Sequence, residues 1–362
     1  MTRNATWILT TALALTGCPS TPPAVDARAA HLAVLPATAD SLAQLDVPRI
    51  IDLQAVDGWL SLLARAGDHP GDASCVGPLL ARAGTVTHIT LPGAGEHHEE
   101  GLALISGDLK AADVAACGAA LMGSAPPAAA ADGSYTMEAH GDEAILIDLP
   151  GGGVAMGTAG GIAIARATQP PAALLATNPL LVRLRTLLPP GGDVDFYLLA
   201  PLGNDEIRVE AAAASLHRGT TDRYEFVLLA GSEDAANTLS MMAMGLPILI
   251  AQMQAMMEQA VAQPDSPAVN REIAAKADPV LNAVREALGN AQVTVEGDAV
   301  RVVLDIDPAA VGPTDLLFVA GMMMGMRKSA GPETGPVDVP AIKAVPPEVV
   351  PPESGPPAVV TP

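Results

Sequence analysis

The chain has 362 residues, with 40 Asp and Glu against 19 Lys and Arg, so its net charge is −21. Such a negative field repels nucleic acid and anionic lipid. With only three Tyr, three Phe and two Trp, the chain has few aromatic rings on which bases could stack. Composition therefore argues against nucleic-acid binding.

The first element in chain order is a short export signal. Arg3 is followed by an apolar run from Ala5 to Leu15. As a helix this run covers ~15 Å, about half of a ~30 Å hydrocarbon core, so a cleaved signal over residues 1–17 is favoured over a transmembrane span.

The apolar run ends in Leu15, Thr16, Gly17 and Cys18. This order resembles the lipobox of bacterial lipoprotein precursors. The resemblance implies that Cys18 receives a diacylglyceryl group, that signal peptidase II cuts before it, and that the new amino terminus is acylated, with palmitate as a typical chain. Two or three acyl chains give stable membrane anchoring. The alternative is an ordinary secreted protein with a chance cysteine.

The resemblance also implies a location in the bacterial cell envelope. Pro19 occupies the position at which some bacteria use Asp for inner-membrane retention, so the outer membrane is favoured. Residues 18–30, with several Pro and Ala, are predicted to be a tether between the lipid and the fold.

With Cys18 assigned to lipid, Cys75 and Cys117 remain. The compartment beyond the inner membrane is oxidising, so a disulfide between them is predicted. Closing that loop would contribute ~4 kcal/mol in the chain-entropy model. The alternative is two unpaired buried thiols.

The order of elements suggests an internal repeat. In the first half, strands at 86–91 and 101–106 lead to a helix at 111–122 and a hairpin of 135–139 with 144–149. In the second, strands at 207–216 and 224–230 lead to a helix from about 234 and a hairpin of 292–296 with 300–306. The second copy carries an extra helical hairpin within 262–289. A helix precedes each copy, at 56–66 and 179–188.

Alternation of apolar and polar residues, as in Ile207 to Ala213, predicts antiparallel strands with two differently packed faces. The predicted fold class is α+β, with two related lobes at 31–168 and 169–327, each a sheet backed by helices. This globular part is loosely similar to two-lobed envelope lipoproteins of Ala-rich, high-GC bacteria, a likeness that assigns no site residues.

Methionine is concentrated in two segments, at 241–257 and 322–326. Leu246, Ile250, Met253 and Met257 recur at helical spacing and form one stripe facing a core. Flexible thioether surfaces can also line an adaptable groove for an apolar ligand, and thioethers alone favour only Cu(I) among metals. Core packing, an apolar groove and a soft copper site are thus the alternatives. Gly245 and Pro247 interrupt the run, so a kink is expected and a membrane span is not.

Two polar motifs have ordinary explanations. The segment from Glu96 to Glu100 contains His97 and His98, but adjacent side chains of one loop rarely complete a metal site, so a solvated hairpin loop is predicted. The glycines at 151–153 and 157 superficially resemble a dinucleotide-binding turn, but 154–156 and 162–165 look like further strand, which predicts a hairpin. No metal or cofactor is assigned.

Residues 328–362 are rich in proline and are predicted to form an extended, disordered tail. This tail is expected to be a solvated spacer, and the alternatives are a ligand for a partner groove and a segment threading the cell wall. No nucleophile elbow, phosphate-binding loop or zinc-protease motif is present. The leading hypothesis is a non-catalytic binding or structural module anchored to a membrane, with an unknown envelope protein as partner. The alternative is a carrier that holds an apolar ligand or lipid against the Met-rich helices.

Overall fold

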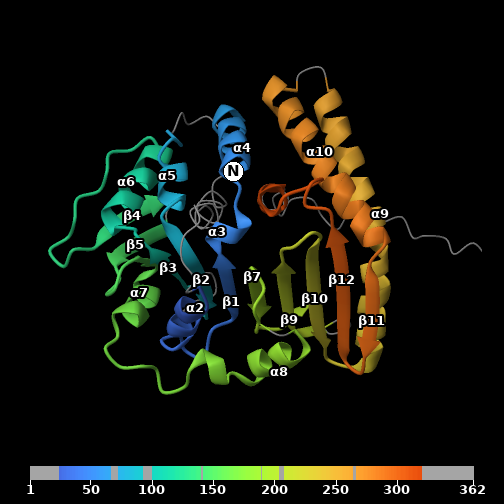
Figure 1. Ribbon diagram of the computed structural model, residues 1–362, viewed down its shortest axis with the longest axis horizontal. Coiled ribbons are helices and arrows are strands. Elements are labelled where there is room, and N and C mark those ends of the chain that lie inside the picture. Colours follow the sequence, from blue (N-terminus) through green and yellow to red (C-terminus); the bar gives the residue numbers. More distant parts are fainter. Residues whose placement is uncertain are drawn as a thin grey trace, which may run out of the picture.

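The structure, a computed structural model, describes residues 24–66, 72–92, 100–139, 142–188, 190–203, 208–263 and 266–319. Within these residues the strands form one antiparallel sheet in the order β11-β12-β10-β9-β7-β1-β2-β3-β6-β5-β4, with β8 paired to β9. Helices lie on both sides of this sheet (Figure 1). The predicted α+β class, with antiparallel strands backed by helices, is confirmed.

The first half of the sheet comes from residues 41–157. Its strands are β1 (Ser41–Asp46), β2 (Ala83–Leu91), β3 (Glu100–Gly107), β4 (Tyr135–Ala139), β5 (Asp142–Asp148) and β6 (Val154–Gly157). Alternate residues along them contribute to two different cores: Leu45 and Val86 to one, Leu42 and Ile89 to the other. Both faces are therefore covered by apolar packing.

The second half comes from residues 194–306. Its strands are β7 (Val194–Leu198), β8 (Leu202–Gly203), β9 (Arg208–His217), β10 (Asp222–Ala230), β11 (Gln292–Glu296) and β12 (Ala299–Ile306). The same alternation holds, because Val300 and Leu304 enter one core and Val227 and Leu229 the other.

The two halves join at β1 and β7, which pair antiparallel from Ser41 opposite Leu198 to Leu45 opposite Val194. From this central pair, β2 and β3 extend the sheet in one direction and β9 and β10 in the other. The two halves therefore repeat the same meander about the centre of a single continuous sheet.

One face carries the larger core. It is covered by α3 (Val47–Ile50), α4 (Leu53–Ala66), α5 (Val76–Leu80) and α6 (Ala111–Leu121) over the first half, and by α9 (Glu233–Ala262) and α10 (Ala268–Gly289) over the second. The other face is covered by α2 (Ala24–Leu32), α7 (Ala159–Arg166), η1 (Leu175–Thr177) and α8 (Pro179–Leu187).

A disulfide joins Cys75, just before α5, to Cys117 in α6, with Cα atoms 5.6 Å apart. The predicted pairing is confirmed. It fastens two neighbouring helices of the same face to each other, across a sequence separation of 42 residues.

Two segments differ from the sequence prediction in their local structure. Residues 24–30, expected in the tether, belong to helix α2, because Arg28 bonds to the carbonyl oxygens of Gly192 and Asp193. Residues 162–165, expected to be strand, lie in α7, which Thr158 caps. Gly161 permits this packing, because a Cβ there would lie 2.3 Å from the Gly101 carbonyl oxygen.

The repeat itself also requires correction. The strand beside β3 is β6 and the strand beside β10 is β12, so the counterpart of the β11–β12 hairpin is β5–β6 rather than β4–β5. Alternation looks the same in every antiparallel hairpin, and so cannot show which one closes the repeat. Residues 268–289 form the single helix α10, which pairs with α9, in place of an added hairpin.

Candidate functional site: the outer face of helix α9

Helix α9 has a well-defined start. Ser232 is extended, and its hydroxyl accepts a hydrogen bond from the Ala235 backbone N–H at 3.1 Å, while Glu233 and Asp234 occupy the first turn, where negative charge is favoured. From Ala235 to Met257 the sequence contains no Asp, Glu, Lys or Arg. In a chain of net charge −21, such a long uncharged stretch within a surface helix is exceptional.

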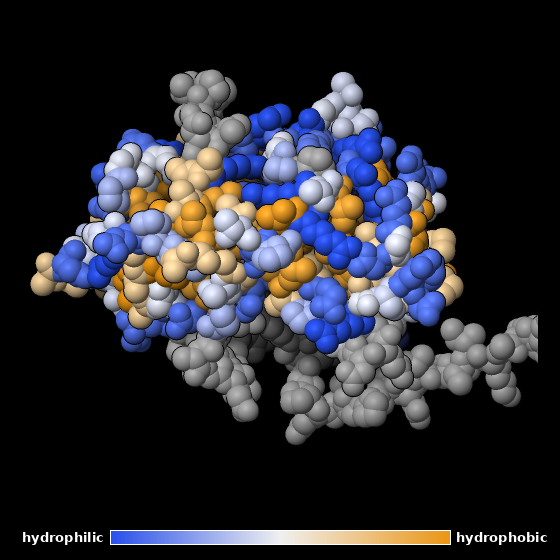
Figure 2. All heavy atoms as spheres, turned by 90° about the horizontal axis from the view of Figure 1, so that it is seen from below, coloured by the Kyte–Doolittle hydropathy of each residue, from blue (hydrophilic) through white to orange (hydrophobic). Residues whose placement is uncertain are grey.

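The outer face of α9 is apolar and exposed. The exposed fractions are 62% for Met241, 60% for Met244 and 66% for Ile248, spaced i, i+3 and i+7. A second exposed stripe contains Met242, Leu249 and Met256. In Figure 2, hydrophobic atoms reach the surface at the right-hand edge, the side on which Figure 1 places α9 and β11. These two stripes, the outer face, are the candidate site.

The inner face of α9 is attached to the body of the protein. Ala236 and Leu239 are buried in the larger core, and Ile250 and Met257 pack against it. The helix continues through Pro247 to Ala262. Its direction is thus fixed by core contacts on one side, while the opposite side has no comparable burial.

The structure divides the stripe predicted from Leu246, Ile250, Met253 and Met257. Ile250 and Met257 contact the core as expected, Met253 is half-buried, and Leu246 is 39% exposed. The expectation that all four face a core is therefore wrong for Leu246, since this side chain lies at the margin between the inner and outer faces. The methionines at 322–326 lie outside the described residues.

The pairing of α9 with α10 includes a buried polar cluster. Gln254, only 5% exposed, donates through Nε2 to Asp278 Oδ1 at 2.9 Å and to Asn282 Oδ1 at 3.2 Å. Asn282 Nδ2 donates to Asp278 Oδ2 at 3.1 Å. Gln254 Oε1 has no hydrogen-bond partner among the described residues, so the two Nε2 bonds are the polar contacts through which Gln254 helps to set the register of the two helices.

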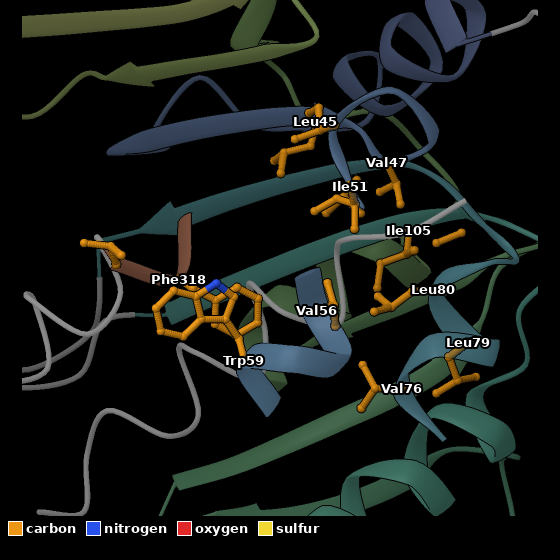
Figure 3. Close-up of a cluster of buried hydrophobic side chains, with 14 of the residues drawn as sticks. Leu45, Val47, Ile51, Val56, Trp59, Val76, Leu79, Leu80, Ile105 and Phe318 are labelled. Atoms are coloured by element: carbon orange, nitrogen blue, oxygen red, sulfur yellow. The ribbon is translucent and has the colours of Figure 1, made fainter. Parts of the chain in front are cut away.

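Helix α10 is attached in turn to α4. The ammonium of Lys276 lies 4.6 Å from the centre of the Trp59 ring, a cation–π contact, and Arg65 pairs with Glu272 at 2.7 Å. Figure 3 shows the Trp59 and Phe318 rings lying one over the other beside the core of α3, α4 and α5. The α9–α10 pair is therefore a fixed part of the protein.

A second apolar surface lies on the same face of the sheet. Phe196 in β7 and Phe226 in β10 both stand opposite Ala214 of β9, so the small alanine separates two aromatic rings. Their exposed fractions are 39% and 37%. Phe226 lies two residues from Leu228, which packs against the core that includes α9. This Phe196–Phe226 surface was missed by sequence reasoning, because register between distant strands cannot be read from one strand.

A Ser, a His and an Asp meet on β7 and β9. The Ser215 hydroxyl donates to Asp195 Oδ1 at 2.7 Å and lies 3.2 Å from His217 Nε2. With the hydroxyl donated to the carboxylate, the direction of the contact between His217 Nε2 and Ser215 Oγ depends on the imidazole tautomer. Gly192 covers the serine, because a Cβ there would lie 2.1 Å from Ser215 Oγ. The three side chains form one hydrogen-bonded cluster on β7 and β9.

Other candidate sites are modest. Within the described ranges, no three His, Cys, Asp or Glu side chains cluster as metal ligands. Residues 96–99, with the two histidines of the predicted loop, lie outside the described residues. Shallow depressions of about 440 and 270 Å³ are lined by α7 residues and by residues 308–315, respectively, and α9 lines neither.

The glycines at 151–153 lie in the turn between β5 and β6, as the predicted hairpin requires. All three have positive φ, and the chain continues as strand rather than as a helix with its N-terminus toward a phosphate. They form a turn and not a nucleotide site.

No protein-family model and no curated protein matches the chain. Among solved structures, the chain is similar to the one titled "Structure of crystal form I of TP0453", with 13% sequence identity and a TM-score of 0.39. The match covers 81% of this chain and 97% of that chain. A likeness at this level supports no statement about function.

Proposed function

We propose that the protein is a lipid-anchored lipoprotein of the bacterial cell envelope that works as a non-catalytic binding module, with the outer face of α9 as its binding surface. The observation that carries the proposal is the exposure of Met241, Met244 and Ile248, each 60% or more, on a helix whose inner face is fixed to the core. Exposed apolar patches of this kind are typical of interaction sites.

Two further features support a binding role. The α9–α10 pair is held by the Gln254 cluster and the Lys276–Trp59 contact, so the surface is presented in a fixed position. Methionine side chains on such a surface adapt to partners of different shape.

The binding surface is tested with the mature chain from residue 18, carrying Cys18→Ala so that no lipid is attached. A neutral solvatochromic dye should bind and brighten, and Met244→Glu with Ile248→Glu should weaken its binding at least tenfold. The matched control adds the same charge at Val182 and Leu202, which are also exposed, at 48% and 54%. Equal dye binding by all three proteins would refute the proposed surface.

The anchor requires a separate test in cells. Cys18→Ala should leave unprocessed precursor and abolish labelling with a radioactive or clickable fatty acid. Processing that continues unchanged would indicate an ordinary secreted protein, and would leave the α9 surface to be judged by the dye experiment alone.

The second candidate function is a carrier for an acyl chain, and the exposed pair Phe196 and Phe226 favours it. An acyl chain lying over Ala214 would contact both rings, which share one face of the sheet. Mass spectrometry of the purified protein should then detect bound lipid that Phe196→Ser with Phe226→Ser removes and Met244→Glu with Ile248→Glu leaves in place. Lipid-free spectra of the parent protein would remove this candidate.

A further inference from the structure

The outer face of α9 has a chemistry that selects its occupant. Resting on the proposed function, we infer that this face docks on the surface of a zwitterionic lipid bilayer, with α9 lying flat in the plane of the interface. Among the described residues, α9 is the one helix that is long and apolar enough to cross a membrane. Within its most apolar 18 residues, however, only 11% are buried in the protein. Apolar side chains that protein does not cover are stabilised by transfer into lipid.

Flat docking, rather than crossing, follows from the attachments of the inner face. A crossing would strip Ala236 and Leu239 from the core and break the contact of Gln254 with Asp278. It would also bring the neighbouring α10, with Arg271, Glu272 and Lys276, toward the hydrocarbon. Lying flat leaves every one of these contacts intact.

The width of the apolar arc favours lipid over a protein partner. At 100° per residue, Met244 and Met242 lie on opposite margins of the outer face, with Met241 and Met256 between them. The exposed arc therefore covers about half of the helix circumference, which matches a helix half-immersed in an interface. A partner helix would contact a narrower seam.

Charge decides the kind of lipid. No charged residue lies between Ala235 and Met257, and the residues that bracket this segment, Asp234 and Glu258, are acidic. Helices that bind anionic membranes instead carry Lys and Arg on the polar face. With a net charge of −21, the protein is repelled by anionic headgroups and is compatible with zwitterionic ones.

The proposed anchor places the protein within reach of such a surface. From Cys18 to Ala24, where the described chain begins, an extended chain spans at most ~20 Å. Helix α2 is in turn fixed to the sheet by Arg28. A lipid on Cys18 would thus hold the folded part close to the bilayer, and since α2 and α9 cover opposite faces of the sheet, the contact of α9 with lipid depends on its own affinity.

The experiment measures partitioning of the unlipidated mature chain, with Cys18→Ala, onto vesicles by flotation. Vesicles of phosphatidylcholine should bind the protein. Vesicles in which about one third of the lipid is phosphatidylglycerol should bind a several-fold smaller fraction of the protein at low salt. Met244→Glu with Ile248→Glu should reduce binding to phosphatidylcholine at least tenfold. The control Val182→Glu with Leu202→Glu, which adds the same charge elsewhere, should bind like the parent.

Urea unfolding of each variant checks that it is folded. If the glutamates unfold the helix, Met242→Gln with Leu249→Gln, on the second stripe, provides an uncharged pair of substitutions. The inference would be overturned if the parent protein did not bind the vesicles, or if it bound the anionic vesicles more strongly. It would also be overturned if both α9 variants bound as well as the parent. A dimer in sedimentation that the same variants dissociate would overturn it in favour of a second copy. If vesicles fail while the dye binds at α9, the proposed function stands and only the bilayer is excluded.

Discussion

The indole Nε1–H of Trp59 donates a hydrogen bond to Asp315 Oδ1 across 2.7 Å, which joins helix α4 to the helical residues 313–319. Trp59 is fully buried and stacks on Phe318 with ring centres 5.8 Å apart. Lys276 of α10 contacts the same indole. One side chain thereby connects three segments that are far apart in sequence.

Trp59→Phe should lower the free energy of unfolding by ~1–3 kcal/mol through the lost donor alone, because Asp315 loses its partner beside a packed core. Asp315→Asn is the matched control, since its amide oxygen still accepts from the indole, and its effect should be smaller. Urea unfolding, followed by far-ultraviolet circular dichroism of the backbone, measures the free energy of unfolding of both variants. Equal stability of Trp59→Phe and the parent would contradict the role assigned to this bond.

Arg28 connects the first described helix to the second half of the sheet. Its guanidinium contacts Asp195 Oδ2 at 3.0 Å, and the two side chains are 13% and 2% exposed. Arg28→Met would leave a buried carboxylate without its counter-charge, which should cost about 3 kcal/mol. Arg65→Met removes an exposed pair instead, with 55% and 49% exposure, and should cost less than ~1 kcal/mol. Thermal unfolding of both variants measures these losses of stability, and equal losses in Arg28→Met and Arg65→Met would contradict the prediction.

The contrast between these two arginines shows how far the sequence could predict the structure. Alternation predicted antiparallel strands such as β2, β3, β9 and β10, because a half-buried strand repeats every two residues. It could not predict that Arg28 contacts Asp195, because these two residues are 167 positions apart in the sequence and only the tertiary structure brings them together. The sequence of residues 24–30 therefore predicts a tether, although these residues form part of α2.

The same limit applies to the candidate site. Methionine content and helical spacing mark the segment of α9 in the sequence, and the absence of Asp, Glu, Lys and Arg from 235–257 marks it as well. A helix that is apolar on all sides, however, has no preferred face in its sequence pattern. Which side is buried is decided by β10, β12 and α10, so the exposure of Ile248 and the burial of Leu239 required the structure.

The disulfide between Cys75 and Cys117 provides a prediction of stability under reduction. The chain-entropy model gives a loss of ~4 kcal/mol for a closed loop of this length, because the reduced unfolded chain is freer. Urea unfolding with and without a phosphine reductant measures the difference. The double variant Cys75→Ala with Cys117→Ala is the control, since its stability should not respond to reductant. A parent protein equally indifferent to reductant would contradict the prediction.

Two half-buried histidines predict a loss of stability in mild acid. Burial lowers the pKa of His31 and of His88 to about 4, from an ordinary value near 6.5. Between these values the unfolded chain binds protons that the folded protein does not, so stability is full above about pH 6.5 and falls as the pH drops toward 4. The loss is on the order of 3 kcal/mol for each imidazole.

His31→Asn tests this assignment, because the imidazole Nδ1 contacts Thr87 Oγ1 at 2.8 Å and the amide can keep a polar contact there. The variant should lose about half of the pH dependence between pH 6.5 and 4, measured as the slope of unfolding free energy against pH. His88 supplies the remainder. An unchanged slope would show that other groups cause the acid response.

Pro247 lies inside α9, one turn from the exposed Met244. A proline within a helix removes one backbone donor and crowds the preceding turn, so Pro247→Ala should raise the free energy of unfolding by ~1–3 kcal/mol. Pro179 is the control: it occupies the first turn of α8, where proline is tolerated, and Pro179→Ala should change stability little. Urea unfolding measures both variants. A Pro247→Ala variant that is less stable than the parent would contradict the prediction.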